Sequence, residues 1–115
     1  ALTKEKIRKT IHRLPKILRD MKQNEEAGKK KHIDPEEAVI VEILDDVIRS
    51  EKKDWVKDLV ENLKREETDI RRIEEVPVSR AKYYLLKNRL VEKIYNCCIS
   101  KGYVTYEDVL GENIN

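Results

Sequence analysis

The chain has 115 residues, of which 42% are charged and only 5% are aromatic, so we expect one small and mostly aliphatic core. The low counts of Gly (3) and Pro (3) disfavour a turn-rich β fold and favour long helices. We therefore expect an all-α protein. No run of about 18 apolar residues is present, so nothing is expected to span a membrane. The adjacent Cys97 and Cys98 are expected not to bridge, which indicates a cytoplasmic protein.

The first predicted helix runs from Thr3 to about Lys22. Its apolar positions recur at three- and four-residue spacing: Ile7, Ile11, Leu14, Leu18 and Met21. Pro15 lies inside this stripe and is expected to kink or split the helix, because proline has no backbone N–H to donate. The segment that follows, QNEEAGKKKHI, has no periodicity and contains Gly28, which predicts a mobile linker.

A second helical region is predicted to begin after Asp34, which can cap a helix whose first position is Pro35. Its apolar stripe consists of Val41, Leu44, Ile48, Trp55, Leu59 and Leu63. No apolar residue lies between Arg49 and Asp54. This gap favours two helices that break near Ser50 over one helix of about thirty residues.

A short helix is predicted from about Thr68 to Glu75, with Ile70 and Ile73 facing inward. It cannot continue through Pro77, because a proline biases the preceding residue away from helical dihedral angles. A tight turn is therefore expected between this helix and the next one.

Ser79 is predicted to cap a longer helix that reaches about Ser100 and ends before Gly102. The tail YVTYEDVLG fits two alternatives, a small strand or a helical turn capped by Thr105. The pattern leaves both open.

A short helix, a tight turn and a longer basic helix together predict a helix-turn-helix over about residues 68–94. In that motif the second helix lies in the major groove of DNA. Between Ser79 and Lys93 the chain has five Lys and Arg residues and one acid, Glu92. Arginine can pair with guanine, asparagine with adenine, and lysine with phosphates. The apolar face, expected to point inward, is Tyr83, Leu86, Leu90 and Ile94, and the candidate DNA-binding residues are Ser79, Arg80, Lys82, Tyr84, Lys87, Asn88 and Arg89.

Charge is unevenly distributed along the chain. Residues 1–33, which we take as a basic helix and linker, carry 11 Lys and Arg against 4 Asp and Glu. Residues 34–77 carry 8 against 15, and they open the helical domain predicted for 34–115. A basic N-terminus suggests contact with a polyanion, whereas its apolar stripe suggests that the helix completes the core or a dimer contact.

The segment TDIRRIEEVPVSRAKYYLLKNRLVEKI resembles the helix-turn-helix in the fourth region of bacterial sigma factors, in the form found in phage late-gene activators of the RinA and ArpU type. The resemblance rests on Val78, Ser79, Tyr83, Tyr84, Lys87, Asn88 and Arg89. It departs from the pattern at Val76 and Pro77, where a glycine is common. It implies a sequence-specific transcriptional regulator of a phage or prophage that contacts RNA polymerase.

Two other functions fit the pattern. One is a small DNA-packaging subunit of a phage terminase, which would form a ring, and the other is a helical module that binds an acidic protein. We expect no enzyme, no cofactor and no metal, because the chain has no Gly-rich phosphate loop, no nucleophile motif and no metal-ligand spacing. The adjacent Cys97 and Cys98 are read as reduced thiols. A homodimer is expected, because the stripe from Val41 to Leu63 is long for so small a core.

Overall fold

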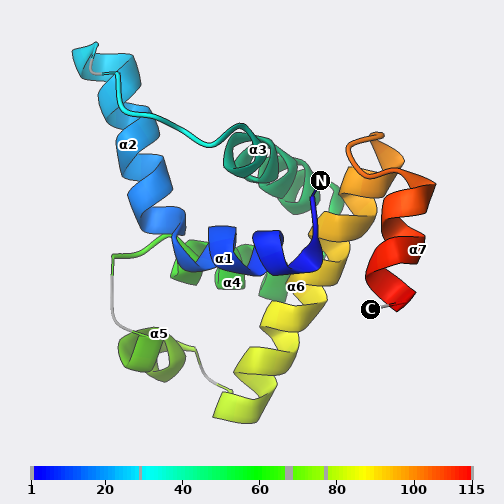
Figure 1. The fold of residues 1–115 in the computed structure, drawn as a ribbon. Helices are drawn as coiled ribbons and strands as arrows, with labels where there is room; N and C mark the ends of the chain where they lie inside the picture. Colours follow the sequence, from blue (N-terminus) through cyan, green and yellow to red (C-terminus); the bar gives the residue numbers. More distant parts are fainter. Residues whose placement is uncertain (1, 29, 67–68, 77, 115) are drawn as a thin grey trace.

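The structure is a computed structural model that describes residues 2–28, 30–66, 69–76 and 78–114. The chain is entirely helical and strand-free over these ranges, so the prediction of an all-α fold is confirmed. Figure 1 shows the helices in order: α1 (Lys4–His12), α2 (Leu14–Ala27), α3 (Pro35–Ser50), α4 (Asp54–Leu63), α5 (Asp69–Glu75), α6 (Arg80–Ser100) and α7 (Tyr106–Ile114).

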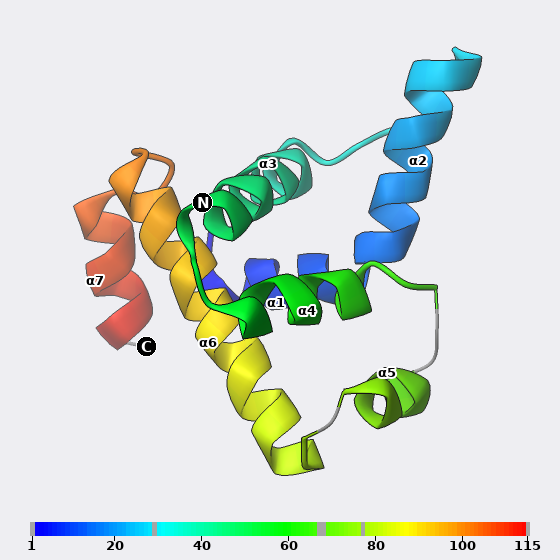
Figure 2. The same ribbon diagram turned by 180° about the vertical axis from the view of Figure 1, so that it is seen from behind.

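The core lies where α1, α3 and α6 pack pairwise against one another, while α4 packs on both α5 and α6. Figures 1 and 2 show α6 as the long diagonal of the molecule, with α7 beside its C-terminal end and α2 projecting outward. Ile7, Ile11 and Leu14 are at most 1% exposed and belong to the same cluster as Leu90 and Ile94 of α6. The N-terminal helix therefore completes the core, as its apolar stripe suggested.

Helix boundaries follow local signals in the sequence. Pro15 falls in the first turn of α2, where a missing N–H costs no intrahelical bond, so the chain divides into α1 and α2 around Arg13. The Asp34 carboxylate accepts a hydrogen bond from the backbone N–H of Glu36 at 2.8 Å and caps α3. The predicted break near Ser50 is confirmed, because α3 ends at that residue and α4 begins at Asp54.

The C-terminal tail is a helix, not a strand. The Thr105 hydroxyl accepts a hydrogen bond from the N–H of Asp108, and the Asp108 carboxylate accepts one from the N–H of Thr105, both at 3.1 Å. This reciprocal pair satisfies two backbone donors at the start of α7. Gly102 has a φ of 80°, a conformation that favours glycine, and lies just beyond the end of α6 as predicted.

The predicted end of the first helical region near Lys22 is wrong. α2 continues to Ala27 and ends at Gly28, which has a left-handed φ of 62°. Four of the five residues that extend the helix are good helix formers: Gln23, Glu25, Glu26 and Ala27. The side chain of Asn24 exchanges two 2.8 Å hydrogen bonds with the backbone of Lys31, so the segment after Gly28 is tied back to α2.

The predicted apolar stripe of α3 and α4 is displaced by one residue in part. Trp55 is half-buried and packs against the core, while the fully buried position is Val56. Similarly, Val41 is half-buried and Ile40 is 1% exposed. Leu44, Leu59 and Leu63 are buried as predicted, so the buried face of each helix is wider than the predicted stripe and includes neighbouring apolar positions.

Helix α5 faces inward at only one of its two predicted positions. Ile70 is 62% exposed, so its prediction is wrong, whereas Ile73 is half-buried against the core. Among the side chains of α5 that the structure describes, the buried one is Arg72, at 4% exposure. Thr68, where this helix was predicted to begin, and Pro77, in the predicted turn, lie outside the described residues.

Candidate nucleic-acid interface

The N-terminal half of α6 has one buried face and a broad exposed surface. Ser79 caps the helix by accepting a hydrogen bond from the N–H of Lys82 at 3.2 Å, as predicted. The predicted inward face is confirmed, because each of its four residues is buried: Tyr83, Leu86, Leu90 and Ile94. This burial fixes which side of α6 is available to a partner.

The candidate DNA-binding residues on α6 fall on two strips. Residues three, four, seven or eight positions apart lie on one side of a helix. The Tyr84 strip, as we name it, consists of Arg80, Tyr84, Lys87 and Asn88, and all of these are exposed except the half-buried Lys87. The remaining two candidates, Lys82 and Arg89, are exposed on another strip with Leu85 between them. We name this second group the Leu85 strip.

The Tyr84 strip is ordered by aromatic contacts. The rings of Tyr83 and Tyr84 meet edge to face, with centroids 5.8 Å apart and planes at 81°. The ammonium of Lys87 lies 5.8 Å from the first ring centroid and 5.9 Å from the second. Cation–π attraction at this range restricts the lysine side chain to a position beside Tyr84.

A buried polar network connects this region to α4 and α5. The hydroxyl of Tyr83 donates a hydrogen bond to the side-chain oxygen Oδ1 of Asn62 at 2.9 Å. The side-chain Nδ2 of Asn62 donates one to the backbone carbonyl of Arg72, also at 2.9 Å. Arg72 in turn donates to the backbone carbonyl of Arg65 at 2.8 Å. Asn62 is 4% exposed, so both of its bonds form away from water, where a lost partner is costly. The network holds α4, α5 and α6 in one relative arrangement.

Asn62 and Arg72 were absent from the residues that sequence reasoning selected. A signal for Asn62 was available, because it follows Leu59 at helical spacing and so falls on the inward face of α4. No comparable signal exists for Arg72, whose burial depends on how α5 packs.

The basic N-terminal segment is largely neutralised within the fold. Its cations reach acids that are distant in sequence: Lys6 with Asp34 (2.6 Å), Arg13 with Glu37 (3.4 Å) and Arg19 with Glu66 (2.5 Å). The hydrogen bond from Lys6 lowers the pKa of the Asp34 carboxyl and raises the pKa of the Lys6 ammonium. Part of the excess positive charge of residues 1–33 is therefore paired with the excess negative charge of residues 34–77 inside the fold.

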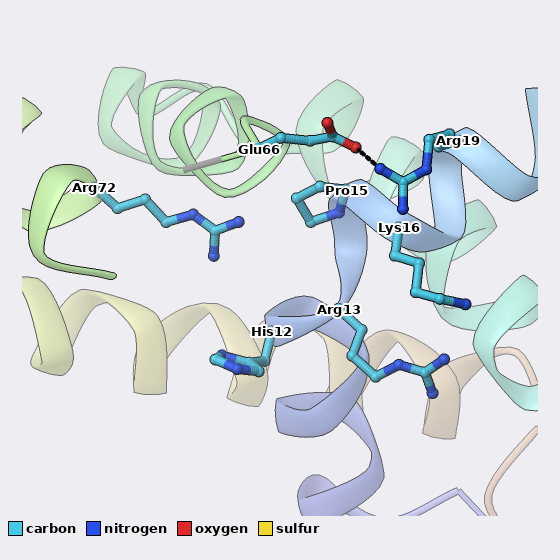
Figure 3. A pocket seen from close by; sticks show the side chains of 7 residues that line it. All are labelled: His12, Arg13, Pro15, Lys16, Arg19, Glu66 and Arg72. Atoms are coloured by element: carbon cyan, nitrogen blue, oxygen red, sulfur yellow. Dashed lines mark hydrogen bonds and ion pairs between the residues drawn. The ribbon is translucent and has the colours of Figure 1, made fainter. Parts of the chain in front are cut away.

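Figure 3 shows a hollow at the junction of α1 and α2, and Arg13 and Arg19 are among the residues that line it. Its volume is about 460 Å³, and it is lined by His12, Arg13, Pro15, Lys16, Arg19, Glu66 and Arg72. The Arg19–Glu66 ion pair spans its edge, and Lys16 bonds to Asp20 at 3.0 Å. These internal pairs reduce the positive charge that the hollow presents to a ligand.

The exposed cations of α6 differ from those of the N-terminal segment. Arg80, Lys82 and Arg89 form no ion pair with any residue that the structure describes. The first turn of α6 contains no acid, and the first acid along the helix is Glu92, which pairs with Lys4 at 3.0 Å. The N-terminal half of α6 therefore offers its positive charge to solvent.

None of the protein-family models, curated proteins or solved structures compared with the chain matches it. Within the described ranges, every helix is too short or too polar to cross a membrane.

Proposed function

We propose that the chain is a sequence-specific DNA-binding transcriptional regulator that reads duplex DNA with the Tyr84 strip of α6. The observation that carries the proposal is that Arg80, which forms no ion pair with any described residue, and the exposed Asn88 two turns later lie on one side of the same capped helix. Arg can form two hydrogen bonds with guanine and Asn two with adenine at the floor of the major groove. Lys87 lies on the same strip, where an ammonium is suited to a backbone phosphate.

The arrangement of the supporting helices also favours this function. Sequence readout requires the reading helix to be held at a definite angle, and the Asn62 network connects α6 to α4 and α5. The resemblance of this segment to the helix-turn-helix of phage late-gene activators supports a regulatory role of the phage or prophage type. We extend the proposal on that ground to contact with RNA polymerase at the promoter.

The test is selection of a binding site from random duplexes, followed by substitutions on the Tyr84 strip. Arg80→Ala is expected to weaken binding to the selected site by about 1–3 kcal/mol and to relax the preference at one base pair. Lys87→Ala is expected to weaken all duplexes alike and to reduce the salt slope by about one unit. Lys57→Ala, at an exposed position on α4, is the matched control and should change neither quantity.

Equal affinity of the wild type and both α6 variants for the selected site would contradict the assignment of this strip. If no duplex binds even at low salt, DNA binding itself is wrong, and a role in binding an acidic protein becomes the better explanation. A ring-sized mass in solution would favour the terminase alternative.

A further inference from the structure

An apolar groove of about 490 Å³ opens between α4, the start of α6 and the segment that connects α5 to α6. Its apolar lining is provided by Trp55, Leu59, Val76, Val78 and Leu86. Trp55 is the only tryptophan of the chain, and it is half-buried, so part of a large aromatic ring remains in contact with water. A groove of this size can accept one or two large apolar side chains.

The rim of the groove is acidic. Asp58 and Glu61 line it from α4, are exposed, and form no ion pair within the described part of the chain. The other rim acid, Glu75, is paired with Arg65 at 2.5 Å. Two carboxylates on the rim therefore remain without an ion-pair partner among the described residues. They favour the binding of an apolar side chain that is flanked by positive charges.

The Leu85 strip has the complementary chemistry. Leu85 is 47% exposed, and it lies three residues after Lys82 and four before Arg89 on the same side of α6. Both cations are exposed and unpaired among the described residues. An exposed leucine between two free cations matches an apolar groove with two free carboxylates.

The two surfaces also adjoin each other. Leu86 lines the groove and lies four residues after Lys82 and three before Arg89, so the same two cations border both the groove and Leu85. A twofold-symmetric contact requires that one continuous patch contain both complementary halves. This patch meets that requirement.

We infer that a second copy of this chain occupies the groove, inserting its Leu85 against Trp55 while its Lys82 and Arg89 face Asp58 and Glu61. The contact is formed twice around the twofold axis. The homodimer expected from the sequence rested on the whole apolar stripe of α3 and α4, which lies in or against the chain's own core. Only Trp55 and Leu59 of that stripe line the groove. The inferred contact uses Lys82, Leu85 and Arg89 and no residue that we assign to the Tyr84 strip, so it can be tested without DNA.

A charge-swap experiment tests the contact. The first double variant is Asp58→Lys/Glu61→Lys, and the second is Lys82→Glu/Arg89→Glu. In a dimer of either variant, like charges would face each other at both copies of the contact. Each variant alone is expected to raise the dimer dissociation constant by roughly a hundredfold, at about threefold for each of four exposed ion pairs. An equimolar mixture of the two variants should dimerise again, because every charge pair in the mixed dimer is opposite. Sedimentation equilibrium without DNA measures all three samples.

The matched control is Glu42→Lys/Asp45→Lys, which makes the same charge change at the same spacing on the exposed side of α3. It should leave the dissociation constant unchanged. Circular dichroism of every variant identifies loss of folding, and restoration of the dimer by mixing cannot arise from two unfolded chains. A wild type that remains monomeric, or a dimer that neither swap variant weakens, would overturn the inference.

Trp55 provides a second readout that survives if a charge variant fails to fold. Dimerisation should move its fluorescence emission to shorter wavelength as protein concentration rises, because Leu85 of the other copy would displace water from the ring. Leu85→Ala should shift this transition to at least about tenfold higher concentration, a factor expected from losing most of one apolar side chain at each contact. An emission spectrum independent of concentration, in a protein that sediments as a dimer, would place the interface elsewhere.

Discussion

The Asn62 network allows a quantitative prediction about the stability of the helix arrangement. Tyr83→Phe removes one hydroxyl and leaves the side-chain oxygen Oδ1 of Asn62 without its donor at 2.9 Å. Asn62 is only 4% exposed, so water does not readily replace that donor. Leaving a buried acceptor unsatisfied costs about 1–2 kcal/mol of unfolding free energy. Asn62→Ala should cost about 2–4 kcal/mol, because it removes the partners of both Tyr83 and the Arg72 carbonyl and leaves a small cavity.

The two substitutions should not be additive. Once Asn62 is absent, the Tyr83 hydroxyl has lost this bond, so Tyr83→Phe in that background should cost little. The expected coupling free energy is about 1 kcal/mol. Urea unfolding of the four proteins, followed by circular dichroism and analysed as two-state transitions, measures it.

Tyr103→Phe is the matched control, since it removes the same hydroxyl from a side chain that is 44% exposed. Its effect should stay within about 0.5 kcal/mol. Additivity of the Asn62 and Tyr83 substitutions within about 0.3 kcal/mol would refute the reasoning, because it would mean that the two side chains do not interact in solution.

Two further predictions concern charge and backbone conformation. Lys6 lowers the pKa of Asp34, so this contribution to stability is complete above the unfolded pKa of about 3.9 and is lost as pH falls through the lower folded pKa. Asp34→Asn keeps a capping side chain but should flatten the loss of stability below about pH 4; an unchanged acid limb in urea titrations would disagree. Gly102→Ala should destabilise by about 1 kcal/mol because of its positive φ, whereas Gly111→Ala, inside α7 with no atom within 4 Å of an added methyl, should stabilise by about 0.5–1 kcal/mol. The melting temperatures of the two variants should therefore shift in opposite directions from that of the wild type. A shift in the same direction would contradict the conformations given to Gly102 and Gly111.

Much of the helical framework was readable from the amino-acid sequence. Asp34 and Ser79 were predicted as caps, and Pro15 as a point of division, because these residues act on backbone groups within one turn of themselves. Thr105 was the cap in one of the two alternatives left open for the tail. The inward face of α6 was also predicted correctly, since a single uninterrupted helix keeps its periodicity of 3.6 residues. Local signals of this kind need no knowledge of where the rest of the chain lies.

The candidate interface was only partly readable in the same way. The sequence selected seven residues as one DNA-binding set, but helical spacing distributes the exposed ones on α6 over two neighbouring strips. For the N-terminal cations the sequence left contact with a polyanion as one of two alternatives, whereas in the fold Lys6 and Arg19 reach acids 28 and 47 residues away. Pairings over such separations leave no local trace.

What the sequence alone determined was therefore the identity and ends of most helices, since caps, prolines and apolar periodicity act within a few residues. The tertiary structure decided which surfaces remain available. It turned Ile70 outward, buried Arg72, and joined Trp55 to Leu86 across a groove, because these outcomes depend on how helices distant in sequence pack. The physical reason is that burial and charge pairing are properties of neighbours in space, and only folding establishes those neighbours.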